Sequence, residues 1–228
     1  LDSGFGAALI QKRDPTPTDI SSIFYFNIAV GMLAAGLLCL VAPWIAAFYG
    51  QPILTPLTRA FSLTIVINSF GLVQTTILEK QINFKALTKV SLAANGLSGI
   101  IGIAMAISGY GVWSLAIQQI SGSLLRVVIV WFLSDWRPTL VFSATSLRQM
   151  FGFGSRMMVS RLLNQFFNNI YLPVVGKFYS ATDLGFFTRA TSLEQLPSHT
   201  LSAMVGKVTF PVFASIQDDP IRLKRGLK

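Results

Sequence analysis

The chain has 228 residues, of which 52% are hydrophobic and 12% are charged, and it carries a formal net charge of +9. Soluble domains carry about 25% charged residues, so this composition excludes an ordinary soluble protein and indicates a membrane protein. The basic residues are spread between apolar stretches rather than gathered on one polar face, so we expect no nucleic-acid binding.

The first predicted element is the apolar stretch at residues 1–10, which is too short to cross a bilayer alone. It has no initiator methionine, basic leader region or cleavage motif, so it does not read as a signal peptide. We therefore expect an internal fragment that begins with the end of a membrane span.

Six longer apolar segments follow, separated by proline- and glycine-rich loops that include Pro15 and Pro17. About 20 residues of helix cross a hydrocarbon core of roughly 30 Å, and each segment is long enough. The first four are strongly apolar, whereas the last two have polar faces. We predict an all-α polytopic membrane protein with about six full transmembrane helices, at residues 22–48, 57–78, 90–109, 112–134, 150–175 and 184–206.

The loops between these segments alternate in charge. Eleven basic residues fall in loops on one side, against Lys177 and Arg59 on the other. Basic loops stay on the cytoplasmic side of a membrane. The first, third and fifth loops and the C-terminal tail are therefore predicted to be cytoplasmic.

Arginines in the last two segments are the most informative residues. Arg156 and Arg161 lie inside 150–175, and Arg189 lies near the start of 184–206. Each charge in hydrocarbon costs roughly 2.5–3.5 kcal/mol on insertion scales, so such residues usually face a water-filled path. We favour a cationic cavity for the first two, whereas Arg189 could also extend to the interface.

Amides follow the same helix face. Asn164 and Asn168 form one stripe, Gln165 lies on the next, and Leu162 and Phe166 lie on the apolar side. These amides fit a substrate-binding wall and hydrogen bonds between helices equally well. Single amides in the earlier spans leave the same two alternatives, at Asn27, Asn68, Gln74, Asn95, Gln118 and Gln119.

Signatures of catalysis are missing from the sequence. Cys39 and His199 are the only residues of their kinds, and no zinc-protease, paired-cysteine or nucleophile-elbow motif occurs. We therefore expect no enzyme, no metal site and no cofactor. Glu194 is the one acid that falls inside a predicted span and is the candidate coupling residue.

Four ordered segments carry a family resemblance: DSGFGAALIQKRD, LEKQINFK, GKFYSATDLGFFTRATSLEQLP and FPVFASIQDD. Across essentially its whole length the chain resembles the Wzx-type, colanic-acid-exporter-like polysaccharide flippases of the multidrug/oligosaccharidyl-lipid/polysaccharide superfamily. The resemblance implies a MATE-like bundle of two lobes. Residues 1–134 would be the remainder of the first lobe, and 135–149 would be a cytoplasmic linker. Residues 150–228 would be the start of the second lobe and a cytoplasmic tail.

The resemblance also implies a function. Such proteins move an undecaprenyl-diphosphate-linked oligosaccharide across the bacterial inner membrane by alternating access, beside the polysaccharide polymerase machinery. Arginine forks suit phosphate oxygens, so Arg156, Arg161 and Arg189 would contact the diphosphate or acidic sugars.

Two other functions stay open. A cation-coupled multidrug antiporter of the same superfamily would need acidic cavity residues, of which the spans have few. A membrane polymerase or ligase acting on lipid-linked sugars would need a large outward loop, and every outward loop is about ten residues or shorter.

Overall fold

The computed structural model describes residues 4–12, 14–179 and 182–193, and these are helices joined by short connections. Residues 182–193 are also helical. The prediction of an all-α protein is confirmed. The helices whose two ends both lie among the described residues are α1 (Phe5–Gln11), α2 (Pro17–Tyr49), α3 (Leu54–Lys80), α4 (Phe84–Ile107), α5 (Val112–Leu133), α6 (Ala144–Asn169) and α7 (Tyr171–Phe178).

Within the described residues, the four helices α2 to α5 are long and apolar enough to cross a membrane. Large apolar side chains on them point outward, including Leu40, Ile107 and Phe132. A surface of this kind is stable in hydrocarbon and not in water. The chain is therefore a multi-pass membrane protein. Helix α6 is also long enough at 26 residues, but its three arginines and its amides make it too polar to meet the same measure.

Helix α2 begins five residues before the predicted span, because its start is a capping box. The Asp19 amide donates to Thr16 Oγ1 at 3.2 Å, and the Thr16 amide donates to Asp19 Oδ2 at 2.9 Å. Pro17 is the first helical residue, where a missing N–H costs nothing. Interpreting Pro17 as a loop residue was wrong, since proline is as compatible with the first turn of a helix.

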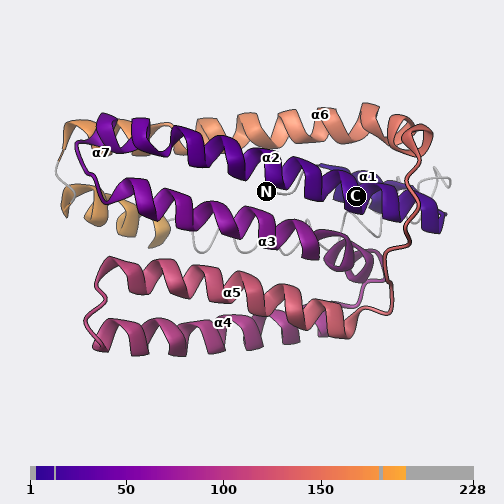
Figure 1. Ribbon diagram of the computed structural model, residues 1–228, viewed down its shortest axis with the longest axis horizontal. Helices are drawn as coiled ribbons and strands as arrows, with labels where there is room; N and C mark the ends of the chain where they lie inside the picture. The colour runs from indigo at the N-terminus through magenta and orange to yellow at the C-terminus, as the bar shows by residue number, and fades with distance from the viewer. Residues whose placement is uncertain (1–3, 13, 180–181, 194–228) are drawn as a thin grey trace, which may run out of the picture.

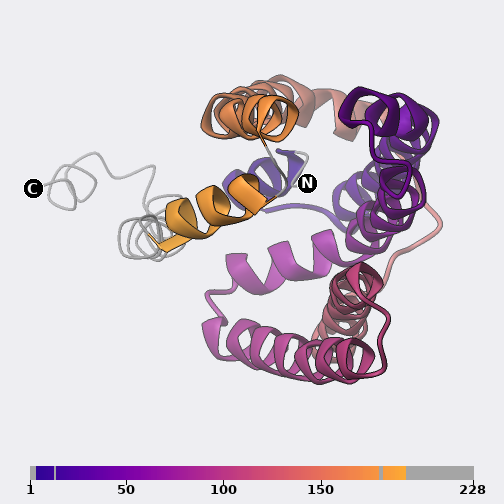
Figure 2. The ribbon, with the colours of Figure 1, turned by 90° about the vertical axis from the view of Figure 1, so that its left-hand side faces the viewer.

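The helices form an open arc in the order α6, α2, α3, α5, α4, which is clearest in the end-on view of Figure 2. Helix α1 lies inside the arc and contacts both α3 and α6. The loops at the right-hand end of Figure 1 are those rich in basic residues, and we call this the basic end. The loops and adjoining turns there carry Lys12, Lys80, Lys85, Arg137 and Arg148.

Helices α6 and α7 run beside α2 in the same direction and contact it at both ends (Figure 1). At the basic end, the Ser143 amide donates to Ser22 Oγ at 2.8 Å. At the opposite end, Lys177 Nζ donates to the carbonyl of Phe48, and a Cβ on Gly176 would lie 3.2 Å from the Tyr49 ring. These two contacts hold α2 against the start of α6 at the basic end and against α7 at the opposite end.

Polar contacts fasten the C-terminal end of α1 to its neighbours α2 and α3. Lys12 Nζ forms an ion pair with Asp19 at 2.6 Å, and Lys80 Nζ donates to the Leu9 carbonyl at 3.2 Å. Asp19 is only 2% exposed, so Lys12 and the Thr16 amide take the place of water as partners of its carboxylate.

Replacing Asp19 with alanine should therefore lower the free energy of unfolding by about 1–3 kcal/mol, because it removes a helix cap and leaves the Lys12 ammonium without its acid. Thermal unfolding of the full-length protein in detergent would measure this loss. The matched control is Asp135→Ala, at an exposed linker position. Equal melting temperatures for the two variants would contradict the assignment.

Candidate functional site: a cavity with a cationic wall

A cavity of about 890 Å³ lies between α2, α3 and α6, in the stretch of α2 and α6 between their two end contacts. Cavities of this size accept drug-sized ligands. We call it the central cavity. Its lining comprises Asn27, Val30, Gly31 and Ala34 of α2, Ile65, Ser69 and Leu72 of α3, and Met158, Arg161, Leu162, Asn164, Gln165 and Asn168 of α6.

One wall of the central cavity is cationic and rich in amides. Arg161, Asn164, Gln165 and Asn168 are spaced three or four residues apart, so one face of α6 carries all four. All four are exposed. A guanidinium offers five donors in a fixed fork, and each amide offers both donors and an acceptor. Such a wall suits a ligand that combines an anionic group with hydroxyls.

The opposite wall is uncharged and mostly apolar, with polar side chains at Asn27 and Ser69. Asn27 is 3% exposed and Ser69 is 7% exposed, and both border the cavity. Helices α2 and α3 approach closely here, since a Cβ on Gly31 would lie 2.8 Å from Ser69 Cβ. This wall offers hydrogen bonds at two positions and carries no charge among the described residues, so the cavity has one charged side and one neutral side.

Sequence reasoning left the role of Asn27 open and did not single out Ser69 or Gly31. The spacing of Asn27 and Gly31 by four residues is the signal that could have found the α2 side. Other single amides bridge helices: Asn68 donates to Ser123 at 3.5 Å, and Arg126 donates to Asn95 at 3.3 Å.

The structure separates the predicted arginines. Arg161 lines the central cavity, whereas Arg156 is exposed elsewhere on α6, five positions away and thus about 140° around the axis. Arg189 is exposed on the 182–193 helix and does not line this cavity. Glu194 lies outside the described residues. Leu162, expected on the apolar face, also borders the cavity.

Arg161 is the one charged residue on the cavity wall formed by the described helices. No group of three or more metal-ligating side chains occurs in the described part of the chain. The arrangement therefore favours an anionic ligand bound by hydrogen bonds and charge.

Comparison with known proteins agrees with this environment. A family described as "Polysaccharide biosynthesis protein" matches residues 1–228. The teichuronic acid biosynthesis protein TuaB of Bacillus subtilis is 34% identical over 94% of this chain and 45% of its own length. The succinoglycan biosynthesis transport protein ExoT of Rhizobium meliloti is 26% identical over 99% of this chain and 46% of its own.

The lipopolysaccharide biosynthesis protein WzxC of Escherichia coli is 23% identical over 98% of this chain and 46% of its own length. The chain thus spans about half the length of the curated relatives it matches. No solved structure matches it significantly.

Proposed function

Because the chain belongs to the polysaccharide biosynthesis protein family, we propose that it is part of a flippase for lipid-linked polysaccharide precursors. The substrate is an undecaprenyl-diphosphate-linked oligosaccharide, a precursor of lipopolysaccharide, capsule or exopolysaccharide. The protein moves it across the bacterial inner membrane and performs no chemistry on it. Relatives whose names specify polysaccharide transport and biosynthesis support this class of function.

The observation that carries the proposal is the cationic wall inside a bundle of membrane-spanning helices. A diphosphate offers oxygen pairs that match the fork of Arg161, and sugar hydroxyls match the amides of Asn164, Gln165 and Asn168. The prenyl tail needs no polar partner and stays in the surrounding lipid. The cavity then transfers only the polar part of the substrate.

The mechanism we propose is alternating access between two lobes. Residues 1–134 complete the first lobe, 135–149 form a cytoplasmic linker, and 150–228 begin the second lobe. The basic end faces the cytoplasm, because basic loops are retained on that side. The central cavity lies between α2 and α3 of the first lobe and α6 of the second, where opening of the lobes would expose it. The polysaccharide polymerase is the partner that uses the translocated substrate.

The direct test is reconstitution of the full-length protein in liposomes that contain a fluorescent undecaprenyl-diphosphate oligosaccharide. We expect the labelled headgroup to reach the opposite leaflet faster than in protein-free liposomes. An undecaprenyl lipid with a neutral linkage in place of the diphosphate is the matched control. Equal rates for both lipids would contradict recognition of the diphosphate, and absence of translocation would contradict the flippase assignment.

A further inference from the structure

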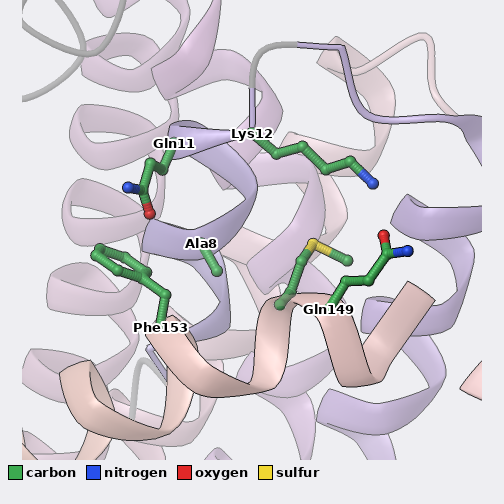
Figure 3. Close-up of a pocket in the computed structure, with 6 residues that line it drawn as sticks. Ala8, Gln11, Lys12, Gln149 and Phe153 are labelled. Atoms are coloured by element: carbon green, nitrogen blue, oxygen red, sulfur yellow. The ribbon is translucent and has the colours of Figure 1, made fainter. Parts of the chain in front are cut away.

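A second, smaller pocket lies between α1 and α6 (Figure 3). Its α6 residues are nearer the start of that helix, and so nearer the basic end, than those of the central cavity. It has a volume of about 340 Å³. Gln11 and Lys12 come from the C-terminal end of α1, and Gln149 and Phe153 come from the first half of α6. We call it the end pocket.

The first turn of α1 fits tightly against α6. Gly4 has a φ of +75°, which favours glycine, and a Cβ there would lie 2.4 Å from the Gly154 carbonyl oxygen and 2.7 Å from the Met158 amide nitrogen. Met158 also lines the central cavity. Gly4 therefore adjoins the boundary of the central cavity, and no larger residue can occupy its place.

The partner residue on α6 is also a glycine. A Cβ on Gly154 would lie 3.0–3.2 Å from three carbons of the Phe5 ring, so this ring rests directly on the α6 backbone. Phe5 is 1% exposed. Its ring centroid lies 4.7 Å from that of Phe26 and 6.0 Å from that of Phe151. Phe26 precedes Asn27, which lines the central cavity. The contact is apolar and excludes water.

The attachments of α1 differ on its two sides. Polar contacts with Asp19 and Lys80 fasten it to α2 and α3. It meets α6 through the backbone of Gly4 and through an apolar cluster of Phe5, Ala8 and Leu9 with Met150. Separating α1 from α6 therefore breaks apolar contacts and no ion pair among the described residues, while α2 would lose the hydrogen bond from the Ser143 amide to Ser22. Helix α1 would move together with α2 and α3 when it separates from α6.

We infer that Gly4 and Phe5, seated on Gly154, form a gate that closes the central cavity toward the basic end. The end pocket is the space outside this gate and the central cavity is the space inside it. The contribution of the gate to transport rests on the proposed function, but its action as a seal does not. Opening requires Phe5 to leave the α6 backbone.

The first test measures access to the cavity without any substrate. A single cysteine is placed at Asn164 in the full-length protein, with Cys39→Ser and any other cysteine removed, and a membrane-impermeant thiol reagent is added from the basic end. A cysteine at the exposed Asp135 identifies that side. We expect Gly154→Val to raise the labelling rate of the Asn164 cysteine about tenfold or more, because overpacking of this size shifts a closed seal toward opening.

The matched control is Gly152→Val on the same helix, since a Cβ on Gly152 has nothing within 4 Å. It should leave the labelling rate unchanged. Equal labelling in the Gly154→Val variant and its parent, or equal acceleration by Gly152→Val, would overturn the gate.

A second test is independent of folding defects. Cysteines at Phe5 and Gly154 should form a disulfide, because the Gly154 Cβ position lies 3.2 Å from Phe5 Cγ. Cross-linking should stop labelling from the basic end and stop export, and a reductant should restore both. Normal export by fully cross-linked protein would overturn the gate. If labelling follows these expectations but neither the parent nor any variant translocates the lipid, the proposed function is contradicted and the gate is not.

Discussion

Replacing Arg161 with alanine should reduce export of the lipid-linked precursor about 10- to 100-fold, while the protein still inserts and folds. The reason is the loss of a forked, charged donor at the cavity wall. A hydrogen bond to a charged group contributes about 1.5–3 kcal/mol, which corresponds to about that range in affinity. Headgroup translocation in proteoliposomes measures the change, at equal amounts of folded protein.

Two further variants test whether the loss depends on the guanidinium group and on its position in the cavity wall. Arg161→Lys should retain part of the activity, because lysine keeps the charge and loses the bidentate fork. Arg156→Ala removes an arginine of the same helix that does not line the central cavity. It should leave the rate of translocation nearly unchanged. A loss of activity in Arg156→Ala as large as that in Arg161→Ala would show that cavity lining is not the property that matters.

Replacing Gly31 with alanine should lower the free energy of unfolding by about 1–3 kcal/mol, because the added Cβ would lie 2.8 Å from Ser69 Cβ. Helices α2 and α3 would have to separate, and the neutral wall of the central cavity would shift with them. Thermal unfolding in detergent measures the loss. Ser69→Gly in the same chain should restore most of the stability, since it removes the atoms that the new methyl group meets.

The control variant should change the free energy of unfolding in the opposite direction. Gly36 lies on the same helix, and a Cβ there meets nothing within 4 Å. Gly36→Ala should raise stability by up to about 1 kcal/mol, because alanine loses less backbone entropy than glycine in a helix. If Gly31→Ala behaves like Gly36→Ala, the close approach of α2 and α3 does not limit stability.

Composition and hydropathy were sufficient to predict the four apolar spans, because long runs of leucine, isoleucine and valine leave few alternatives to a membrane helix. The periodicity of the 150–175 segment also placed Asn164, Gln165 and Asn168 near Arg161. These features are local, since each depends on residues within a few turns of one helix.

The structure adds what local patterns do not contain. The α2 and α3 wall opposite Arg161 depends on which helices are neighbours, and Ser69 has no feature of its own that marks it. Two arginines in one segment looked equivalent in composition, yet a difference of about 140° around α6 separates Arg156 from the central cavity. The place of α1 was equally inaccessible, because Phe5 and Gly154 are far apart in sequence and meet only through the fold.

The paired contacts along α2 define a lever. From Tyr49 against Gly176 to Ser22 beside Ser143, α2 runs 27 positions, or about 40 Å of helix. If the Tyr49 contact acts as a pivot, a rotation of about 10° would part the surfaces at the other extremity by about 7 Å and break the hydrogen bond from the Ser143 amide to Ser22. Gly154 lies 11 positions from Ser143, about 16 Å closer to the pivot, so the same rotation would part Phe5 from Gly154 by about 4 Å. Apolar packing is lost beyond roughly 4.5 Å between atoms, so this added separation would end the contact. In such a movement the Gly176 contact stays closed, because it lies at the pivot, and each helix moves as a rigid rod.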